Sequence, residues 1–143
     1  MSNFFIRTWK DVTKEEGNVL TITRNPSFKE KPHPENGSLP KPKLKVGDTA
    51  YVYYTFKQRS GDHVSGNGLY CSGKVLGVSD TAIQLKINTR IGKIPFNNAD
   101  PKYKEALVKR ESPLCVYLIK NCSEGYNILS DQIAEFLDTY LVS

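Results

Sequence analysis

Residues 45–56 read KVGDTAYVYYTF, and this stretch decides the fold that we expect. Gly47 and Asp48 favour a tight turn, because glycine accepts unusual backbone angles and an aspartate side chain bonds to nearby backbone groups. The aromatic and β-branched residues that follow give the strongest strand signal in the chain. We therefore predict a strand over 49–56 that is entered through a turn.

The residues after this strand predict an antiparallel meander. Residues 58–67 are typical of a hairpin loop, and a second strand over 68–78 returns from it. Two glycines inside that second strand indicate a bulge or a close backbone approach. A third strand over 81–87 alternates polar residues with an apolar set that we expect to face inward, namely Ile83, Leu85 and Ile87.

Further elements are predicted on both sides of the meander. They are strands over 4–9, 18–24 and 112–119 and short helical segments over 11–17 and 102–108. The clearest helix covers 130–141, where Ser130 is a good N-cap residue. Its apolar side chains recur at three- and four-residue spacing and should pack on the sheet; they are Ile133, Phe136, Leu137, Tyr140 and Leu141.

Residues 25–43 interrupt this pattern. Five of the eight prolines fall in this stretch, which therefore lacks the backbone donors of a central strand and the propensity of a helix. We expect a long surface loop here. Loops of such length in compact domains are often functional, and this one is also basic.

The length of 143 residues fits a single domain over 1–143. Many strands with few helices predict an α+β fold. We expect a small, mixed, mostly antiparallel β-barrel with short helices and a C-terminal helix packed outside. The apolar runs are too short for a membrane-spanning helix, and the N-terminal residues do not resemble a signal peptide, so we expect a cytoplasmic protein without a membrane partner.

Charge is distributed unevenly along the chain. The net charge is +5, and residues 24–59 alone carry eight cations against three acids. Residues 121–143 carry four acids and no Lys or Arg. This asymmetry is typical of a polyanion-binding face opposite an acidic one, although a solvated Lys-rich loop explains it equally well. The expected phosphate contacts are Arg24, Lys41, Lys43, Lys45, Lys57 and Arg59.

The common catalytic patterns are absent. The sequence holds no P-loop, no GxSxG and no HExxH motif, and it has only two histidines. The three cysteines, Cys71, Cys115 and Cys122, form no CxxC pair, which argues against a disulfide framework and a thiolate zinc site. We therefore expect no metal and no cofactor, and these absences favour binding over catalysis.

Aromatic residues offer a second kind of contact with nucleic acid. An unstacked base needs aromatic faces for stacking and cations for its phosphates. Alternation along the strand places Tyr51 and Tyr53 on one face and Tyr54 on the other, so that not all of them can line one pocket. The residues that we expect to form a base pocket are Trp9, Tyr51, Tyr53 and Tyr70, although a lone Trp is also a common core residue.

The order of several short motifs resembles the EVE family of PUA-like domains. The matching stretches are FFIRTW at 4–9, LKVGDTAYVYY at 44–54, GLYCSGKVLGV at 68–78 and SPLCV at 112–116, before a closing acidic helix. This resemblance implies a pseudobarrel with external helices and a pocket for a modified or flipped base in DNA or RNA. Trp9 and the strand from Tyr51 to Tyr54 would match the pocket side.

Three functions remain open at this point. The first is a nucleic-acid-binding module that reads a base in the aromatic pocket. The second is a protein-interaction or inhibitor module that uses the proline-rich 25–43 loop, whose prolines lower the ordering cost of binding. The third is a ribonuclease resembling the barrel-shaped toxins, for which the candidate residues are Arg59, His63 and Ser65.

Overall fold

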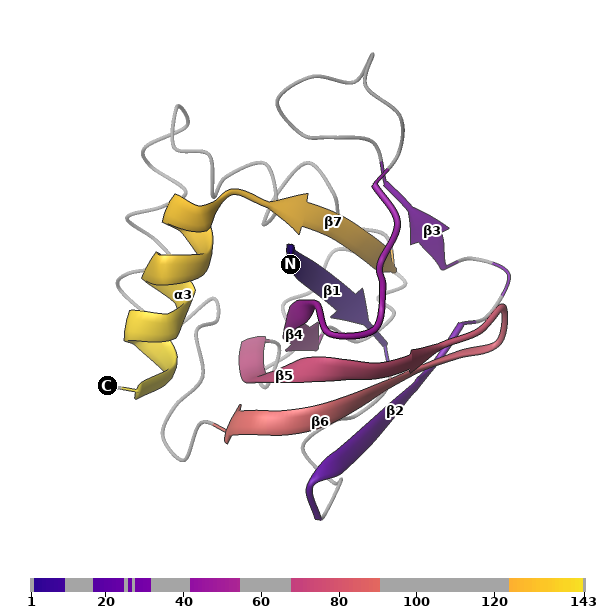
Figure 1. The fold of residues 1–143 in the computed structure, drawn as a ribbon, viewed down its shortest axis with the longest axis horizontal. Helices are drawn as coiled ribbons and strands as arrows, with labels where there is room; N and C mark the ends of the chain where they lie inside the picture. Colours follow the sequence, from indigo (N-terminus) through magenta and orange to yellow (C-terminus); the bar gives the residue numbers. More distant parts are fainter. Residues whose placement is uncertain are drawn as a thin grey trace, which may run out of the picture.

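The computed structural model describes residues 2–9, 17–24, 26, 28–31, 42–54, 68–90 and 124–142. These ranges form a sheet-rich fold with one C-terminal helix (Figure 1). The elements in chain order are β1 (Asn3–Thr8), β2 (Val19–Thr23), β3 (Lys29–Glu30), β4 (Thr49–Tyr54), β5 (Gly68–Val78), β6 (Ala82–Arg90), β7 (Gly125–Leu129) and α3 (Asp131–Val142).

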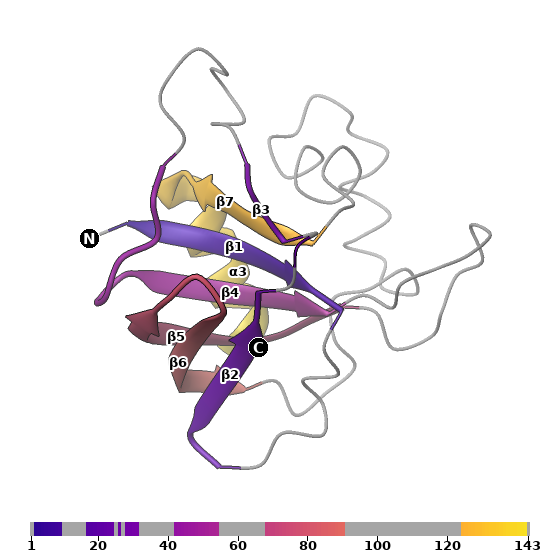
Figure 2. The same cartoon turned by 90° about the vertical axis from the view of Figure 1, so that its right-hand side faces the viewer.

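All the described strands belong to one seven-stranded sheet in the order β2-β6-β5-β4-β1-β7-β3. The β4, β5 and β6 strands pair antiparallel, which confirms the predicted meander. The β2–β6 and β1–β7 pairs are antiparallel too, whereas β1–β4 and β3–β7 are parallel. Figure 2 shows β1 and β4 side by side and running in the same direction. The sheet is therefore mixed and mostly antiparallel, as expected.

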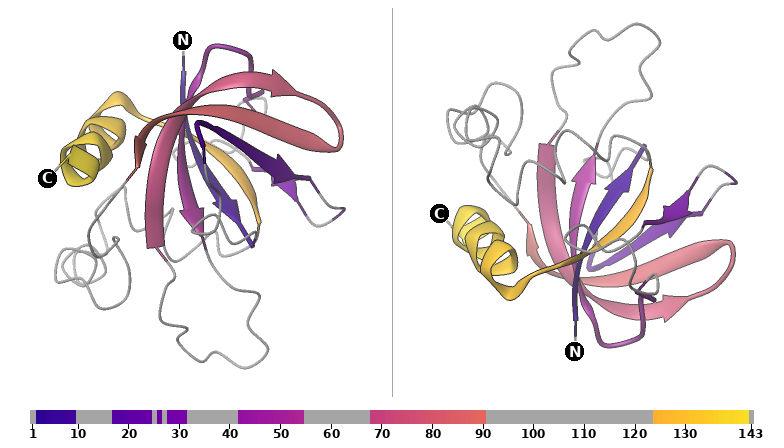
Figure 3. Two further views of the ribbon diagram at one scale, coloured as in Figure 1. Left: turned by 90° about the horizontal axis from the view of Figure 1, so that it is seen from below. Right: turned by 90° about the horizontal axis from the view of Figure 1, so that it is seen from above.

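The sheet curves around an apolar core on its inner face, and the end views in Figure 3 show this curvature. Alternate residues of β1, β2, β4, β5, β6 and β7 enter this core, together with Phe28 and Leu44. In β6 the predicted alternation is confirmed, because Ile83 and Leu85 are fully buried while Gln84 and Lys86 are exposed. Among the strands that the structure describes, β2 and β3 are the two edges, and no backbone pairing joins them.

The turn before β4 forms where the sequence predicts it. Gly47 has a φ of 92°, a conformation that suits glycine. The buried Asp48 carboxylate accepts hydrogen bonds from the backbone N–H of Lys45 at 2.8 Å and from the backbone nitrogen of Ser2 at 3.0 Å. Asp48 therefore closes the turn and holds the beginning of β1 beside it.

The glycines of β5 mark irregular pairing, as predicted. Its register with β6 shifts between Ser72 and Gly73, and again between Val75 and Gly77. A Cβ atom on Gly73 would lie 2.5 Å from the backbone oxygen of Lys86. Both the bulge and the close backbone approach are thus confirmed, and bulges of this kind bend a strand and increase its twist.

The C-terminal helix α3 lies outside the curved sheet (Figure 1). Its predicted cap is confirmed, because the Ser130 Oγ atom accepts a hydrogen bond from the Ile133 N–H at 3.3 Å. Ile133 and Leu137 are buried as expected. The prediction for Phe136 is wrong, since this side chain is 38% exposed and Ala134 is buried in its place. The side chains of 140 and 141 lie outside the described residues.

Two strands occur where the sequence pattern predicts none. β7 covers residues 125–129, and β3 lies inside the expected 25–43 loop. β3 is compatible with the proline-rich surroundings because it is only two residues long and lies at a sheet edge. The strand predicted over 112–119 and the helical segment over 102–108 lie outside the described residues, as do most of 25–43 and all of the helical segment over 11–17 except Gly17.

Candidate nucleic-acid interface

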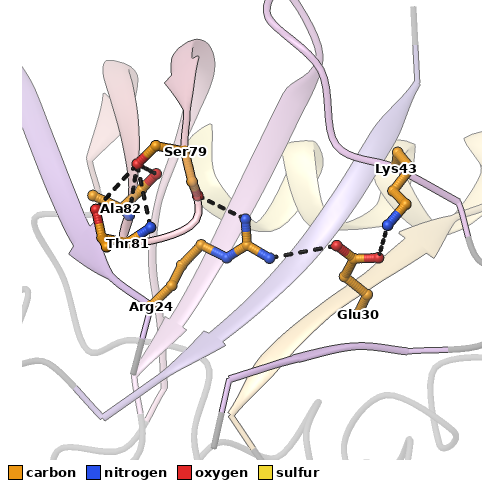
Figure 4. Close-up of polar contacts among 6 residues, drawn as sticks. All are labelled: Arg24, Glu30, Lys43, Ser79, Thr81 and Ala82. Carbon is orange, nitrogen blue, oxygen red and sulfur yellow. Dashed lines mark hydrogen bonds and ion pairs between the residues drawn. The ribbon is translucent and has the colours of Figure 1, made fainter. Parts of the chain in front are cut away.

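Two of the expected phosphate contacts, Arg24 and Lys43, meet at one carboxylate. The Arg24 Nη2 atom lies 3.4 Å from Oε1 of Glu30, and the Lys43 Nζ atom forms an ion pair with Oε2 of the same residue (Figure 4). The Lys43 side chain is 65% exposed, whereas that of Arg24 is 15% exposed. The structure therefore brings these two cations together, with an acid between them.

Other contacts hold the Arg24 side chain in place. Its Nη1 atom donates a hydrogen bond to the Ser79 backbone oxygen at 2.8 Å, in the turn between β5 and β6 (Figure 4). The guanidinium carbon lies 5.7 Å from the centre of the Phe28 ring and 5.9 Å from that of Tyr126. These ring contacts are within the range of cation–π attraction. Arg24 is thus fixed by three groups besides Glu30.

The charges of this cluster shift two pKa values in opposite directions. The hydrogen bond from Lys43 is the main cause that lowers the pKa of Glu30, and the positive charges of Lys43 and Arg24 add to it, while burial opposes it. Burial raises the pKa of the Tyr126 phenol, and the negative charge of Glu30 raises it further. Near neutral pH the cluster thus holds an ionised Glu30 and a neutral Tyr126.

The remaining cations of this region differ in exposure. Lys29 in β3 and Lys45 before the β4 turn are exposed, whereas Lys31 is 5% exposed. The expected contacts Lys41, Lys57 and Arg59 lie outside the described residues. The described part of the basic segment therefore presents Lys29, Lys43 and Lys45 to solvent.

Trp9 follows the last residue of β1 and is half-buried. Its backbone N–H donates to Oε2 of Glu124 at 2.9 Å, and the Thr8 hydroxyl lies 3.3 Å from the same oxygen. Glu124 is 2% exposed, and its backbone oxygen accepts a hydrogen bond from the Lys29 N–H at 3.1 Å. One buried glutamate therefore bonds to the backbone of both Trp9 and Lys29.

Tyr51 and Tyr53 lie on the other face of the sheet, away from the inner core. The Tyr51 hydroxyl donates a hydrogen bond of 2.7 Å to the Asp138 carboxylate of α3, and this tyrosine is 1% exposed. Burial, followed by the bond to Asp138, raises the pKa of the Tyr51 phenol. Tyr53 is 3% exposed and packs against the Phe5 ring and the Arg7 guanidinium. Both tyrosines are thus part of the packing of this face.

Tyr70 is half-buried and packs against the inner core. Its ring centre lies 6.1 Å from that of Tyr54, on the face opposite to Tyr51 and Tyr53. Tyr54 pairs with Thr8 in β1, so Tyr70 and Trp9 lie towards the same end of the sheet. The four expected pocket residues therefore divide between two faces of the sheet. Trp9 and Tyr70 are half-buried, whereas Tyr51 and Tyr53 are buried.

Three residues of the site escaped sequence reasoning: Glu30, Glu124 and Tyr126. The charge count treats Glu30 as one acid within a basic stretch, and nothing in the pattern pairs it with Arg24 and Lys43. Tyr126 belongs to β7, which the sequence pattern does not predict, and Glu124 is the residue before that strand. The only local signal is an isolated acid between two lysines, Lys29 and Lys31.

Other kinds of site find little support in the described residues. No three His, Cys, Asp or Glu side chains among them gather into a group that could hold a metal ion. No helix in the described ranges has the length and apolar character needed to cross a membrane. The residues considered for a ribonuclease, Arg59, His63 and Ser65, lie outside those ranges. Most of the 25–43 loop, considered for protein binding, does so too.

The chain was compared with family models, with curated proteins and with solved structures, and none of the three comparisons found a match.

Proposed function

We propose that this chain is a nucleic-acid-binding module. The observation that carries the proposal is the pair of hydrogen bonds at Glu124, whose carboxylate accepts from the N–H of the half-buried Trp9 and whose backbone oxygen accepts from the N–H of the exposed Lys29. Proteins that bind single-stranded nucleic acid combine aromatic side chains, on which bases stack, with cations along the path of the backbone. Trp9 supplies the aromatic face after the end of β1. The exposed cations are Lys29 towards that end, Lys43 at Glu30, and Lys45 by the turn beside the start of β1.

The proposal includes a finer description of the fold. The curved, mixed sheet with an external C-terminal helix is compatible with the PUA-like pseudobarrel that the sequence resembles, in which Trp9 would lie on the side of a base pocket. Because Tyr51 and Tyr53 are buried, we propose Trp9 and Tyr70 as the aromatic residues that contact a base. A modified or flipped base is the ligand that such a pocket would accept.

Salt dependence tests this proposal. Binding of fluorescein-labelled single- and double-stranded DNA and RNA oligonucleotides is measured by fluorescence anisotropy at several salt concentrations. Affinity should fall steeply as salt rises, because each neutralised phosphate releases counterions. Negligible binding of all four oligonucleotides at low ionic strength would contradict the proposal.

Charge variants locate the contact. Lys29→Gln and Lys45→Gln should each weaken binding and reduce the slope of log affinity against log salt by about 0.7–0.9. Lys86→Gln is the matched control, because Lys86 is also exposed but lies in β6, paired with Val19 of β2. An equal loss in all three variants would mean that only net charge matters and would remove the case for this surface.

A further inference from the structure

We propose that Arg24 and Lys43 form a phosphate-binding site that the Glu30 carboxylate occupies from within the chain. The ligand class is a phosphate group, and the inference rests on the proposed function in taking that group to be a backbone phosphate of a nucleic acid. Glu30 then acts as an autoinhibitory contact. Binding of the nucleic acid exchanges the carboxylate for phosphate oxygens.

The two ion pairs of Glu30 have the arrangement that a bound phosphate requires. Oε1 faces Arg24 Nη2 at 3.4 Å, while Oε2 faces the Lys43 ammonium group. Each oxygen of one anionic group thus has its own cation, as Figure 4 shows. Arginine and lysine bind phosphate oxygens through the same charge-assisted hydrogen bonds that they make with carboxylates. Glu30 therefore takes the place of two phosphate oxygens.

Arg24 would remain in position when Glu30 leaves. Its second guanidinium nitrogen donates to the Ser79 backbone oxygen at 2.8 Å, and the guanidinium lies near the Phe28 and Tyr126 rings. The Ser79 and Phe28 contacts do not involve the carboxylate, whereas the Tyr126 hydroxyl is also hydrogen-bonded to it. A cation that is already held in place loses little conformational freedom when it binds a ligand, and this favours affinity.

The carboxylate is also placed where it can be displaced. Glu30 belongs to the two-residue edge strand β3, and its side chain is 24% exposed. The ion pair with Lys43, whose side chain is 65% exposed, contributes little net stability. A nucleic acid that brings several phosphates to Lys29, Lys43 and Lys45 can therefore compete with a single carboxylate.

The variant Glu30→Gln tests the inference, because it removes the negative charge and keeps the side-chain size. With a fluorescein-labelled single-stranded DNA on the order of ten nucleotides long, we expect Glu30→Gln to bind about fivefold more tightly than the wild type. The slope of log affinity against log salt should become steeper by about 0.7 for each additional phosphate that the variant neutralises. Should Glu30→Gln not fold, Glu30→Thr suits an edge strand and carries the same expectation.

Asp80→Asn is the matched control for the change in net charge. Asp80 is exposed in the turn beside Ser79, and among the described residues it has no ion pair with Arg24 or Lys43. Its neutralisation should change affinity less than about twofold, since only long-range attraction is altered. Equal increases in affinity in Glu30→Gln and Asp80→Asn would overturn the inference.

A second measurement separates the inference from the proposed function. Wild type and Glu30→Gln are titrated with inorganic phosphate, and the Arg24 Nε–H signal is followed by NMR. A phosphate-dependent shift in Glu30→Gln that is weaker in the wild type supports the phosphate site. If this shift occurs but neither protein binds the oligonucleotide, only the proposed function is wrong. If the wild type binds the oligonucleotide and Glu30→Gln binds neither ligand more tightly, the inference is overturned while the proposed function stands.

Discussion

The Nη2 atom of Arg24 lies 3.4 Å from Oε1 of Glu30, and this contact joins the two edges of the sheet. Arg24 follows β2 at one edge, and Glu30 belongs to β3 at the other. In the described part of the chain no backbone pairing links these strands. Side chains therefore supply the connection that hydrogen bonds between strands supply elsewhere in the sheet.

Acid should weaken this connection. The groups that face Glu30 are Lys43, Arg24 and the Tyr126 hydroxyl, and they hold the pKa of Glu30 below its ordinary value of 4.5. A carboxyl group with a lower pKa in the folded state stabilises the fold above the unfolded pKa, and this stability is lost as pH falls through the folded pKa. The free energy of unfolding should therefore fall more in the wild type than in Glu30→Gln as pH decreases below 4.5.

Urea unfolding of both proteins at a series of pH values measures this effect. The wild type should be the more stable protein near neutral pH, and the difference should shrink in acid. A difference that is the same at every pH would show that the Glu30 charge does not stabilise the fold.

Replacing Gly73 by alanine should destabilise the protein by about 2 kcal/mol. The new Cβ would meet the Lys86 backbone oxygen at 2.5 Å, and a backbone atom in a paired strand moves only at a cost. Gly77→Ala is the matched control, because the nearest atom to its Cβ would be the flexible Gln84 Oε1 at 3.9 Å. Thermal and urea unfolding compare the two variants, and equal stability would contradict the close approach at Gly73.

Tyr51→Phe should lower the free energy of unfolding by about 1 kcal/mol. The variant keeps the buried ring and removes the 2.7 Å hydrogen bond to Asp138 that ties β4 to α3. Asp138→Asn should cost less, because the amide oxygen still accepts the bond from the hydroxyl. If Tyr51→Phe unfolds at the same urea concentration as the wild type, the bond to Asp138 does not hold the helix.

Trp9→Ala should weaken oligonucleotide binding about tenfold if a base stacks on this ring. The hydrogen bond to Glu124 comes from the Trp9 backbone, so the substitution does not remove it directly. Trp9→Phe should keep most of the affinity, since it retains an aromatic face. Phe136→Ala is the control, because Phe136 is a 38% exposed aromatic residue on α3. Anisotropy titrations compare the wild type with these three variants. Similar affinities for Trp9→Ala and Phe136→Ala would exclude stacking on Trp9.

The sequence predicts the β4–β5–β6 meander well because its residues combine β-propensity with alternation and clear turns. Ile83 and Leu85 face the core while Gln84 is exposed, and this pattern is visible in the sequence. The helix α3 is equally visible through its cap and spacing. Phe136 could not be assigned by spacing alone, because the helical period leaves its position at the border of the apolar face.

β7 could not be predicted from residues 125–129. This strand reads GYNIL, begins with glycine and contains Asn127, which is buried at 2% exposure despite its polar side chain. Its place depends on pairing with β1, which lies more than a hundred residues away in the chain. Long-range pairing of this kind leaves no local signal.

The sequence also could not show which of the expected pocket tyrosines are buried. Alternation correctly separates Tyr51 and Tyr53 from Tyr54, but it does not tell which face is covered. Both faces of β4 are buried. One face packs in the core, and on the other face Tyr51 is hydrogen-bonded to Asp138 of α3. The ion pairs of Glu30 likewise depend on the curvature that brings β2 and β3 together, and a charge count does not contain that information.

Mapping the bound oligonucleotide by NMR tests the central claim most directly. Backbone amide and Trp9 indole signals of the labelled protein are recorded while unlabelled single-stranded DNA is added. We predict that the largest shifts fall on Trp9, Lys29, Lys43 and Lys45, and that the exposed positions of α3, such as Glu135, stay unchanged. Absence of shifts at saturating DNA, or shifts centred on α3, would contradict the account.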